Sequence, residues 1–196
     1  AKTGMLVSAG IIEVVAAFLD AHPVPLVVDP VMVSSSGARL LREDAVDAMV
    51  QRLFPLATVV TPNLFEARAL TGVDGSRREL AARLHAMGAA AVIVTGGHGE
   101  DAVDHLFDGR RHIEIAVERH DVAGTHGAGC THSATLAALI AQGWPLDEAA
   151  HRAAEVASAS VARGLIEIGG GEGPVDVLDI RSRVAAPPVM AGGGRR

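Results

Sequence analysis

Residues 124–143 read GTHGAGCTHSATLAALIAQG, a glycine-rich loop that turns into an apolar stretch with helical spacing. Three glycines fall within the first six residues, and glycine lets a backbone approach a ligand closely. The stretch predicts a helix from about Gly129 to Gln142. The start of a helix offers unpaired N–H groups and a partial positive charge, so Gly127, Ala128 and Gly129 are expected to form an anion-binding site.

Cys130, the only cysteine of the chain, stands at this junction between loop and helix. The field that attracts an anion there also favours the thiolate, so Cys130 could act as a general base on a substrate hydroxyl. The alternative is a buried cysteine that packs as a small hydrophobic residue, and the glycine spacing leaves both open. Two related glycine motifs do not fit. A dinucleotide-binding fingerprint would need glycine in place of His132, and a P-loop would need Lys followed by Ser or Thr.

Apolar runs on both sides of this loop alternate between strand-like and helix-like patterns. Strands are expected at 3–7, 25–30, 57–63 and 90–97, a hairpin at 102–118, and helices at 11–21, 43–54, 64–72, 80–88 and 146–163. Such alternation is typical of an α/β domain that has a mostly parallel sheet with helices on both faces. One domain is expected over residues 1–184, and the tail at 185–196 is expected to be disordered.

The composition excludes several classes of protein. With 196 residues, 49% hydrophobic and 20% charged, the chain has the profile of an ordinary globular domain. A net charge of −6 without a concentrated basic patch argues against a nucleic-acid partner. One cysteine excludes an intramolecular disulfide and a multi-cysteine metal site, which favours a reducing cytoplasm. No apolar run reaches the ~18–20 residues of a membrane span, so no membrane partner is expected.

Polar and glycine-rich positions follow the predicted strands, at the edge where ligands bind in sheets of this kind. Asp29 ends one strand, whereas Asn63 and Glu66 lie one turn apart at a predicted helix start, where they could hold hydrated Mg²⁺ near phosphates. Their spacing equally suits an ordinary capping box. Thr95 begins a Thr-Gly-Gly turn that could bring N–H groups to a phosphate, or could be a turn only. His98 and the other histidines show no partner at ligand spacing and are expected to be mostly solvated or structural.

Four motifs occur in a definite order along the chain. They are DPVM at 29–32, TPNLFEA at 61–67, GGH at 96–98 and THGAGCT at 125–131, accompanied by KTGML at 2–6 and EIGGGEGPV at 167–175. Together they resemble the ribokinase-like superfamily, and more closely the hydroxymethylpyrimidine/phosphomethylpyrimidine kinase family of thiamine biosynthesis. The similarity covers residues 1 to about 180. Most of the superfamily has Asp as base where this sequence has Cys130, whereas the pyrimidine kinases and some related pyridoxal kinases have Cys.

The resemblance implies a three-layer α/β/α fold and a phosphotransferase activity. Mg-ATP would phosphorylate the hydroxymethyl group of 4-amino-5-hydroxymethyl-2-methylpyrimidine, and a second reaction would convert that monophosphate to the diphosphate. The family also suggests a homodimer. Positioning and charge stabilisation matter more than covalent help in such transfers, which suits a backbone anion hole.

The functional positions of the family fall into four groups along this chain. The groups are the anion hole at Gly127, Ala128, Gly129 and Cys130, the Mg²⁺–phosphate region at Asn63 and Glu66, the nucleotide and phosphate side at Thr95, Gly97, His98 and Asp29, and the pyrimidine pocket at Met5 and Val31. By the same resemblance, Cys130 would also serve as the base.

The sequence departs from the family at several places. Ser35 stands where the family often has Lys, Ala128 stands where it commonly has Thr, and residues 169–171 are three glycines in place of Gly-His-Gly. The family also begins with a strand and a glycine-rich substrate loop ahead of the KTGML segment. The chain is therefore expected to lack these N-terminal strands and part of the pyrimidine pocket, as a fragment of a longer kinase. The alternatives are a pyridoxal-type kinase of the same fold and a catalytically inactive remnant.

Overall fold

The computed structural model describes residues 1–33, 40–96, 102–122 and 124–185. Predictions made at Ser35, Gly97 and His98, and for the tail from residue 186 onward, fall outside these ranges. Within the ranges, the chain forms one six-stranded sheet whose strands lie side by side in sequence order. The strands are β1 (Lys2–Thr3), β2 (Val27–Val28), β3 (Val59–Val60), β4 (Val92–Val94), β5 (Val103–Phe107) and β6 (His112–Ala116).

The sheet is parallel in its first four strands and antiparallel in its last two. β1 to β4 pair in parallel, whereas β5 runs antiparallel to both β4 and β6. The β5–β6 hairpin turns at Asp108 and Gly109, where Gly109 adopts a φ of 84°. Asp108 accepts hydrogen bonds from the backbone N–H groups of Arg110 and Arg111, which closes the turn. The predicted mostly parallel sheet and the predicted hairpin are both confirmed.

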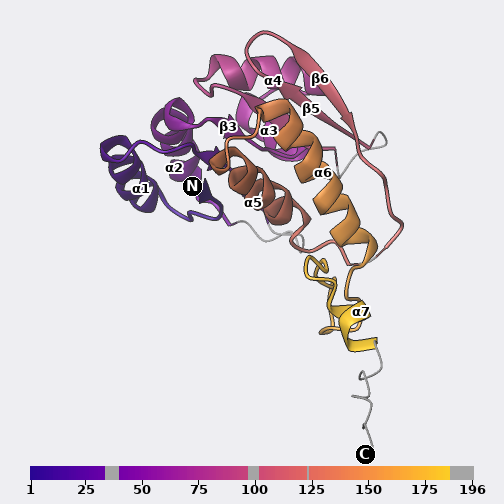
Figure 1. Ribbon diagram of the computed structural model, residues 1–196. Helices are drawn as coiled ribbons and strands as arrows, with labels where there is room; N and C mark the ends of the chain where they lie inside the picture. The colour runs from indigo at the N-terminus through magenta and orange to yellow at the C-terminus, as the bar shows by residue number, and fades with distance from the viewer. Residues whose placement is uncertain (34–39, 97–101, 123, 186–196) are drawn as a thin grey trace, which may run out of the picture.

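Helices cover both faces of the sheet, which gives the molecule three layers (Figure 1). The helices are α1 (Ala9–Ala21), α2 (Glu43–Ala48), α3 (Leu64–Thr71) and α4 (Arg77–Ala86) against one face, α5 (Ala128–Ala141) and α6 (Leu146–Ala162) against the other, and α7 (Ile180–Ala185) beyond them. Neighbouring residues of a strand point to opposite faces, so each strand serves both cores. In β2, for example, Val28 joins the core beneath α1 and Val27 joins the core beneath α5. None of the helices described here is long and apolar enough to cross a membrane.

All four parallel strands, and the helix expected at 43–54, end earlier than the sequence predicted. β1 stops at Thr3, and Val7, with a φ of 61°, marks the turn toward α1. The helix expected at 43–54 is α-helical only as far as Ala48, and is followed by a π-helical turn, η1 (Met49–Leu53), and a 3₁₀ turn, η2 (Phe54–Leu56). Pro55 lies in η2, where it has no N–H group to donate and its ring would crowd the preceding turn of an α-helix, so an α-helix does not continue through this residue.

The local signals at helix ends are confirmed. Asn63 and Glu66 form a complete capping box at the start of α3. The Ser76 hydroxyl accepts a hydrogen bond from the Glu79 N–H at the start of α4. Gly88 follows the C-terminal residue of α4 with a φ of 120°, a conformation that favours glycine. The start of α3 at Leu64 matches the prediction, whereas α4 begins at Arg77, three residues before the helix predicted at 80–88.

The segment after α6 folds back across the glycine-rich loop. The His126 N–H donates to the Gly173 carbonyl over 3.2 Å, and the Val175 N–H donates to the His126 carbonyl over 3.0 Å. Gly164 passes very close to Gly124, since a Cβ atom on Gly164 would lie 2.5 Å from the Gly124 carbonyl oxygen. These contacts tie the loop that precedes α5 to the C-terminal part of the domain.

Candidate active site

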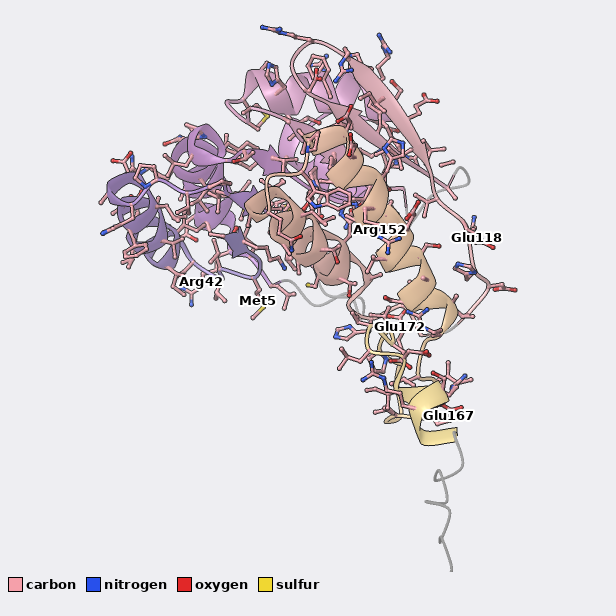
Figure 2. All side chains as sticks on the ribbon, viewed as in Figure 1. Met5, Arg42, Glu118, Arg152, Glu167 and Glu172 are labelled. Atoms are coloured by element: carbon pink, nitrogen blue, oxygen red, sulfur yellow. The ribbon has the colours of Figure 1, made fainter. Side chains whose placement is uncertain are left out.

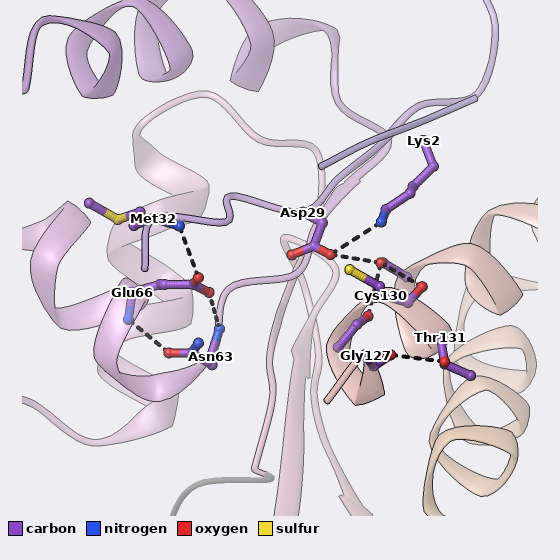
Figure 3. A network of polar contacts seen from close by, with 10 residues as sticks. Lys2, Asp29, Met32, Asn63, Glu66, Gly127, Cys130 and Thr131 are labelled. Carbon is purple, nitrogen blue, oxygen red and sulfur yellow. Dashed lines mark hydrogen bonds and ion pairs between the residues drawn. The ribbon is translucent and has the colours of Figure 1, made fainter. Parts of the chain in front are cut away.

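The predicted site residues from several segments meet at the carboxyl edge of the parallel strands (Figure 3). Asp29 directly follows β2. Asn63 follows β3 and forms a parallel bridge with Thr95, which follows β4. The N-terminal turns of α5, which carry Cys130, reach the same edge through a side-chain hydrogen bond to Asp29. The expectation that these positions lie together is met, although their functional roles stay predictions.

Asp29 is a buried carboxylate with partners from two distant segments. It is 6% exposed, and its Oδ2 accepts a hydrogen bond of 2.9 Å from the Ser133 hydroxyl and lies 3.4 Å from Lys2 Nζ. A buried carboxylate needs such partners, because the loss of water around its charge is costly. Lys2 and Ser133 were not among the predicted site residues. Both lie within recognised motifs, but a pairing over this sequence distance has no local signal.

Glu66 is a second buried carboxylate, and both of its oxygen atoms accept backbone hydrogen bonds. Oε2 accepts from the Asn63 N–H over 2.9 Å, and Oε1 accepts from the Met32 N–H over 3.3 Å. Burial raises the pKa of Glu66 to about 7, against the lowering effect of the two N–H donors, and the negative charge of Asp29 raises it further. The capping-box interpretation of Asn63 and Glu66 is therefore correct, and Glu66 also ties α3 to the segment after β2.

The start of α5 has the geometry expected of an anion-binding loop. Gly127, the N-cap residue, adopts a φ of 91°, which other residues rarely adopt. The first hydrogen bond inside the helix runs from the Thr131 N–H to the Gly127 carbonyl, so the N–H groups of Gly129 and Cys130 have no partner within the helix. A Cβ atom on Gly129 would meet nothing within 4 Å. Open space and unpaired donors thus lie together at this helix end.

Cys130 is exposed and carries a free thiol. In Figure 3 its sulfur lies on the side of α5 that carries the Asp29 contact. The Ser133 hydroxyl that donates to Asp29 also lies 3.3 Å from the Cys130 carbonyl oxygen, which places this turn of α5 close to the carboxylate. The alternative of a buried cysteine packed as a small hydrophobic residue is wrong, because the residue is accessible to solvent.

The turn after β4 is held by the neighbouring strand. The buried Gly96 N–H donates to Asp104 Oδ1 over 2.6 Å. A Cβ atom on Gly96 would lie 2.2 Å from the Val103 carbonyl oxygen, so only glycine fits this close approach. Thr95 precedes it and is half-buried. Asp104 was not among the predicted residues, and no local pattern marks it.

Several histidines have partners that the sequence did not reveal. A ring nitrogen of His105 lies 2.8 Å from a ring nitrogen of His112. A ring nitrogen of His120 lies 2.9 Å from the Ser158 hydroxyl, and one of His132 lies 3.3 Å from Asp104 Oδ2. Each partner belongs to another strand or helix, which explains why sequence spacing could not show the pair.

The two residues predicted to line a pyrimidine pocket lie at the same edge of the sheet. Met5 follows β1 and Val31 follows β2, and these strands are parallel neighbours. The Met5 side chain is 55% exposed and lies at the surface (Figure 2), whereas Val31 is half-buried. Their part in substrate binding stays a prediction.

A cavity of about 440 Å³ lies beside α6. Its lining comes from the segment after β6 and from the second half of α6, and includes Val117, His120, Ser158, Ala159 and Ala162. The C-terminal end of α6 leads to Gly164, which contacts Gly124 in the glycine-rich loop. One wall of the cavity thus lies a few residues before the anion-binding loop in the chain. The other wall leads to Gly164, which contacts that loop.

Comparison with known proteins identifies the family. The family model described as phosphomethylpyrimidine kinase matches residues 1–176. A thiamine biosynthesis bifunctional protein, ThiED, of Geobacter sulfurreducens is 44% identical over 193 residues, which cover 93% of this chain and 39% of that protein. A hydroxymethylpyrimidine/phosphomethylpyrimidine kinase of Rhizobium meliloti is 44% identical over 182 residues, which cover 89% of this chain and 68% of that enzyme. The chain thus spans from about two fifths to two thirds of these relatives.

Solved structures show the same fold. The ADP complex of Bacillus subtilis pyridoxal kinase superposes with a TM-score of 0.82 at 38% identity, covering 92% of this chain and 70% of that one. The AMP-PCP complex of Staphylococcus aureus pyridoxal kinase gives a TM-score of 0.81 at 34% identity, covering 90% and 66%. The three-layer ribokinase-like fold expected from the sequence is confirmed. By its sequence, its sheet and its family match, the chain belongs to the phosphomethylpyrimidine kinase family.

Proposed function

We propose that the protein with this chain phosphorylates 4-amino-5-hydroxymethyl-2-methylpyrimidine, and then its monophosphate, with ATP as the donor, in thiamine biosynthesis. The observation that carries the proposal is the exposed thiol of Cys130 on the first turn of α5, next to the unpaired N–H groups of Gly129 and Cys130. A proton acceptor and an anion site then occur at one point. Kinase relatives that share this sequence over most of its length support the same reading.

The phosphates would lie against the start of α5. The N–H groups of Gly129 and Cys130 and the partial positive charge of the helix end would stabilise the negative charge that the phosphoryl oxygens carry in the transition state. Gly127 permits the left-handed bend that turns these groups outward, and the open space over Gly129 leaves room for a phosphoryl group. The cavity lined by Val117, His120 and Ser158 is our candidate for the nucleoside. Structures of related kinases with ADP and AMP-PCP support a nucleotide as ligand.

Two buried carboxylates fit a nearby magnesium ion. Burial, and to a smaller extent the negative charge of Asp29, raises the pKa of Glu66, so a cation between the phosphates and these two carboxylates would offset their charge. Both Glu66 oxygens already accept backbone hydrogen bonds, and no cluster of three metal-binding side chains is found in the described part of the chain. Asp29, Glu66 and Asn63 would therefore hold the ion through water, as Mg²⁺ sites often do. When bound, Mg-ATP supplies the phosphoryl group and the ion neutralises phosphate charge.

Cys130 would act on the acceptor hydroxyl. Its thiolate would take the proton as the hydroxyl oxygen forms a bond to the γ-phosphorus, and the bond from phosphorus to the ADP oxygen would break. The thiol is accessible, which a proton acceptor for a bound substrate requires. Lys2 would offset the negative charge of Asp29 beside this site, because its ammonium group lies 3.4 Å from Oδ2.

A pyridoxal kinase is the second candidate function. The pyridoxal kinase of Bacillus subtilis has a closely similar structure, and Cys130 does not separate the two kinases. Met5, one of the two residues predicted for the pyrimidine pocket, is mostly exposed, so its position does not favour the pyrimidine over pyridoxal.

A side-by-side assay of the purified protein decides between these functions. The initial rate of ADP formation from Mg-ATP would be measured with the hydroxymethylpyrimidine, its monophosphate and pyridoxal at matched concentrations. We expect the highest kcat/KM for one of the two pyrimidines. A higher kcat/KM for pyridoxal would establish the second candidate, and no turnover of any of the three would indicate an inactive remnant.

A further inference from the structure

Asp104 is a buried carboxylate that joins the turn after β4 to helix α5. It lies on β5 and is 3% exposed. Its Oδ1 accepts the Gly96 N–H over 2.6 Å, and its Oδ2 lies 3.3 Å from His132 Nε2. Gly96 follows Thr95 at the end of β4, and His132 lies two residues after Cys130 on α5. One side chain therefore contacts the start of α5, which the proposed function assigns to the phosphates, and the turn at Thr95, which the family resemblance assigns to the nucleotide side.

The position of Asp104 on its strand explains this link. Its cross-strand partner in β6 is Ile115, which packs in the core beneath α5 and α6. The side chain of Asp104 therefore enters the layer between the sheet and these helices, where His132 is 4% exposed. A buried charged group is costly unless polar groups surround it. The Asp104 carboxylate therefore restricts how far Gly96 and His132, its two polar partners, can move away from it.

The contact with Gly96 is especially close. A Cβ atom at Gly96 would lie 2.2 Å from the carbonyl oxygen of Val103, the residue next to Asp104. The backbone of the turn thus rests directly on β5, and the 2.6 Å hydrogen bond fixes the direction of its N–H. The His132 contact has the distance of an ion pair, although it does not meet hydrogen-bond geometry.

We propose that Asp104 and His132 are positioning residues, which hold the Thr95–Gly96 turn and the N-terminal turns of α5 at the separation that a bound nucleotide needs. The inference rests on the proposed function only for the identity of the ligand. Removing the carboxylate frees the Gly96 N–H from its fixed direction, and changing His132 releases the same carboxylate from the side of α5. Either change therefore alters both segments, although they lie more than thirty residues apart in the sequence.

The test uses Asp104→Asn and His132→Leu in the whole protein, with Asp104→Ala as a stronger second variant. His105→Gln is the matched control. His105 is the next residue of β5 and is also 3% exposed, but its partner is His112 and it lies on the other face of the sheet. Three quantities are measured for each variant: thermal stability, the Kd for Mg-ADP by calorimetry, and amide hydrogen exchange in residues 92–96 and 128–134.

We expect Asp104→Ala to weaken Mg-ADP binding by about tenfold, the scale of a lost hydrogen bond to a charged group, and Asp104→Asn, whose amide oxygen can still accept the Gly96 N–H, to weaken it by a smaller factor. His132→Leu should weaken it by a smaller factor and should speed exchange at Gly96, which it does not touch directly. The double variant of Asp104→Ala and His132→Leu should bind no more weakly than Asp104→Ala alone. His105→Gln should lower stability while leaving the Kd and the exchange at Gly96 unchanged.

Two results would overturn the inference. One is an unchanged Kd in Asp104→Asn and Asp104→Ala, and the other is exchange that rises only around the substituted residue. Failure of the proposed function gives a different result, because the unsubstituted protein would then bind no Mg-ADP. The exchange measurements would still decide whether Asp104 couples the two segments.

Discussion

The hydroxyl of Ser133 on helix α5 donates a 2.9 Å hydrogen bond to the carboxylate of Asp29 at the end of β2, although 104 positions separate the two residues. Ser133 is fully buried, and its hydroxyl also lies 2.9 Å from the Gly129 carbonyl oxygen. This contact sets the start of α5 against the edge of the sheet. The contact therefore holds the anion-binding loop beside the buried carboxylate of Asp29.

Ser133→Ala tests this arrangement. The substitution leaves Asp29 with one donor fewer in a buried place, so we expect the free energy of unfolding to fall by about 2 kcal/mol. We also expect a lower kcat, because the start of α5 loses its anchor. Ser160→Ala is the control, since Ser160 is equally buried but its hydroxyl donates to the Val156 carbonyl of its own helix. Urea denaturation and steady-state kinetics give both quantities. Equal effects of the two substitutions on kcat would contradict this account.

Glu66 gives a defined pH dependence of stability. Its pKa is raised from 4.5 to about 7 by burial, so the folded state binds the proton more tightly than the unfolded chain does. Its contribution to the free energy of unfolding should therefore fall as pH rises from about 4.5 to about 7 and then stay level, by about 3 kcal/mol in total. Burial lowers the pKa values of His105 and His112, and these act in the opposite direction as pH rises toward 6.5.

Glu66→Gln isolates that contribution. Comparing the variant with the unsubstituted protein at pH 5 and at pH 8 cancels the effect of the histidines. We expect the difference in unfolding free energy between the two proteins to change by about 3 kcal/mol between these pH values, in favour of the variant at pH 8. Parallel stability curves for the two proteins would show that Glu66 is not perturbed.

Gly127 and Gly129 should respond to alanine in opposite ways. Gly127→Ala places a side chain at a φ of 91°, so we expect a loss of about 1–2 kcal/mol in unfolding free energy. Gly129→Ala meets nothing within 4 Å and lies inside the helix, so stability should stay equal or rise by up to about 1 kcal/mol. Its methyl group should nevertheless weaken ATP binding, because it fills the open space above the loop. Thermal denaturation and calorimetric titration with ATP separate the two effects, and unchanged ATP binding in Gly129→Ala would argue against a phosphate there.

Local patterns in the sequence predicted the fold well wherever the structure depends on residues that are neighbours in the chain. The capping box of Asn63 and Glu66, the turn at Gly109 and the alternating strands and helices were visible because each depends on neighbouring residues. The end of the helix after Ala48 was missed, although Pro55 was a visible signal that an α-helix does not continue through that residue. The lengths of all four parallel strands were overestimated, and at β1 the cause is that apolar residues continue beyond the paired segment.

The sequence predicted the motifs that form the site, but it did not predict the contacts between them. The glycine loop, Cys130, Asp29 and Glu66 all belong to recognisable segments. The links Ser133–Asp29, Lys2–Asp29 and Asp104–His132 join residues far apart in sequence, and each depends on how strands and helices pack in the folded domain. Such tertiary contacts have no signature in a single sequence, because any one of these residues would look like a solvated polar residue in its own segment.

The role of Cys130 is the central claim, and the turnover of Cys130→Ser measures it most directly. Serine keeps the size of the side chain but is a far weaker proton acceptor, so the change removes a group that acts mainly in the transition state. With the hydroxymethylpyrimidine as substrate, we predict that kcat falls by about a hundredfold or more while the KM for ATP changes by less than about threefold. A kcat equal to that of the unsubstituted protein would contradict the account.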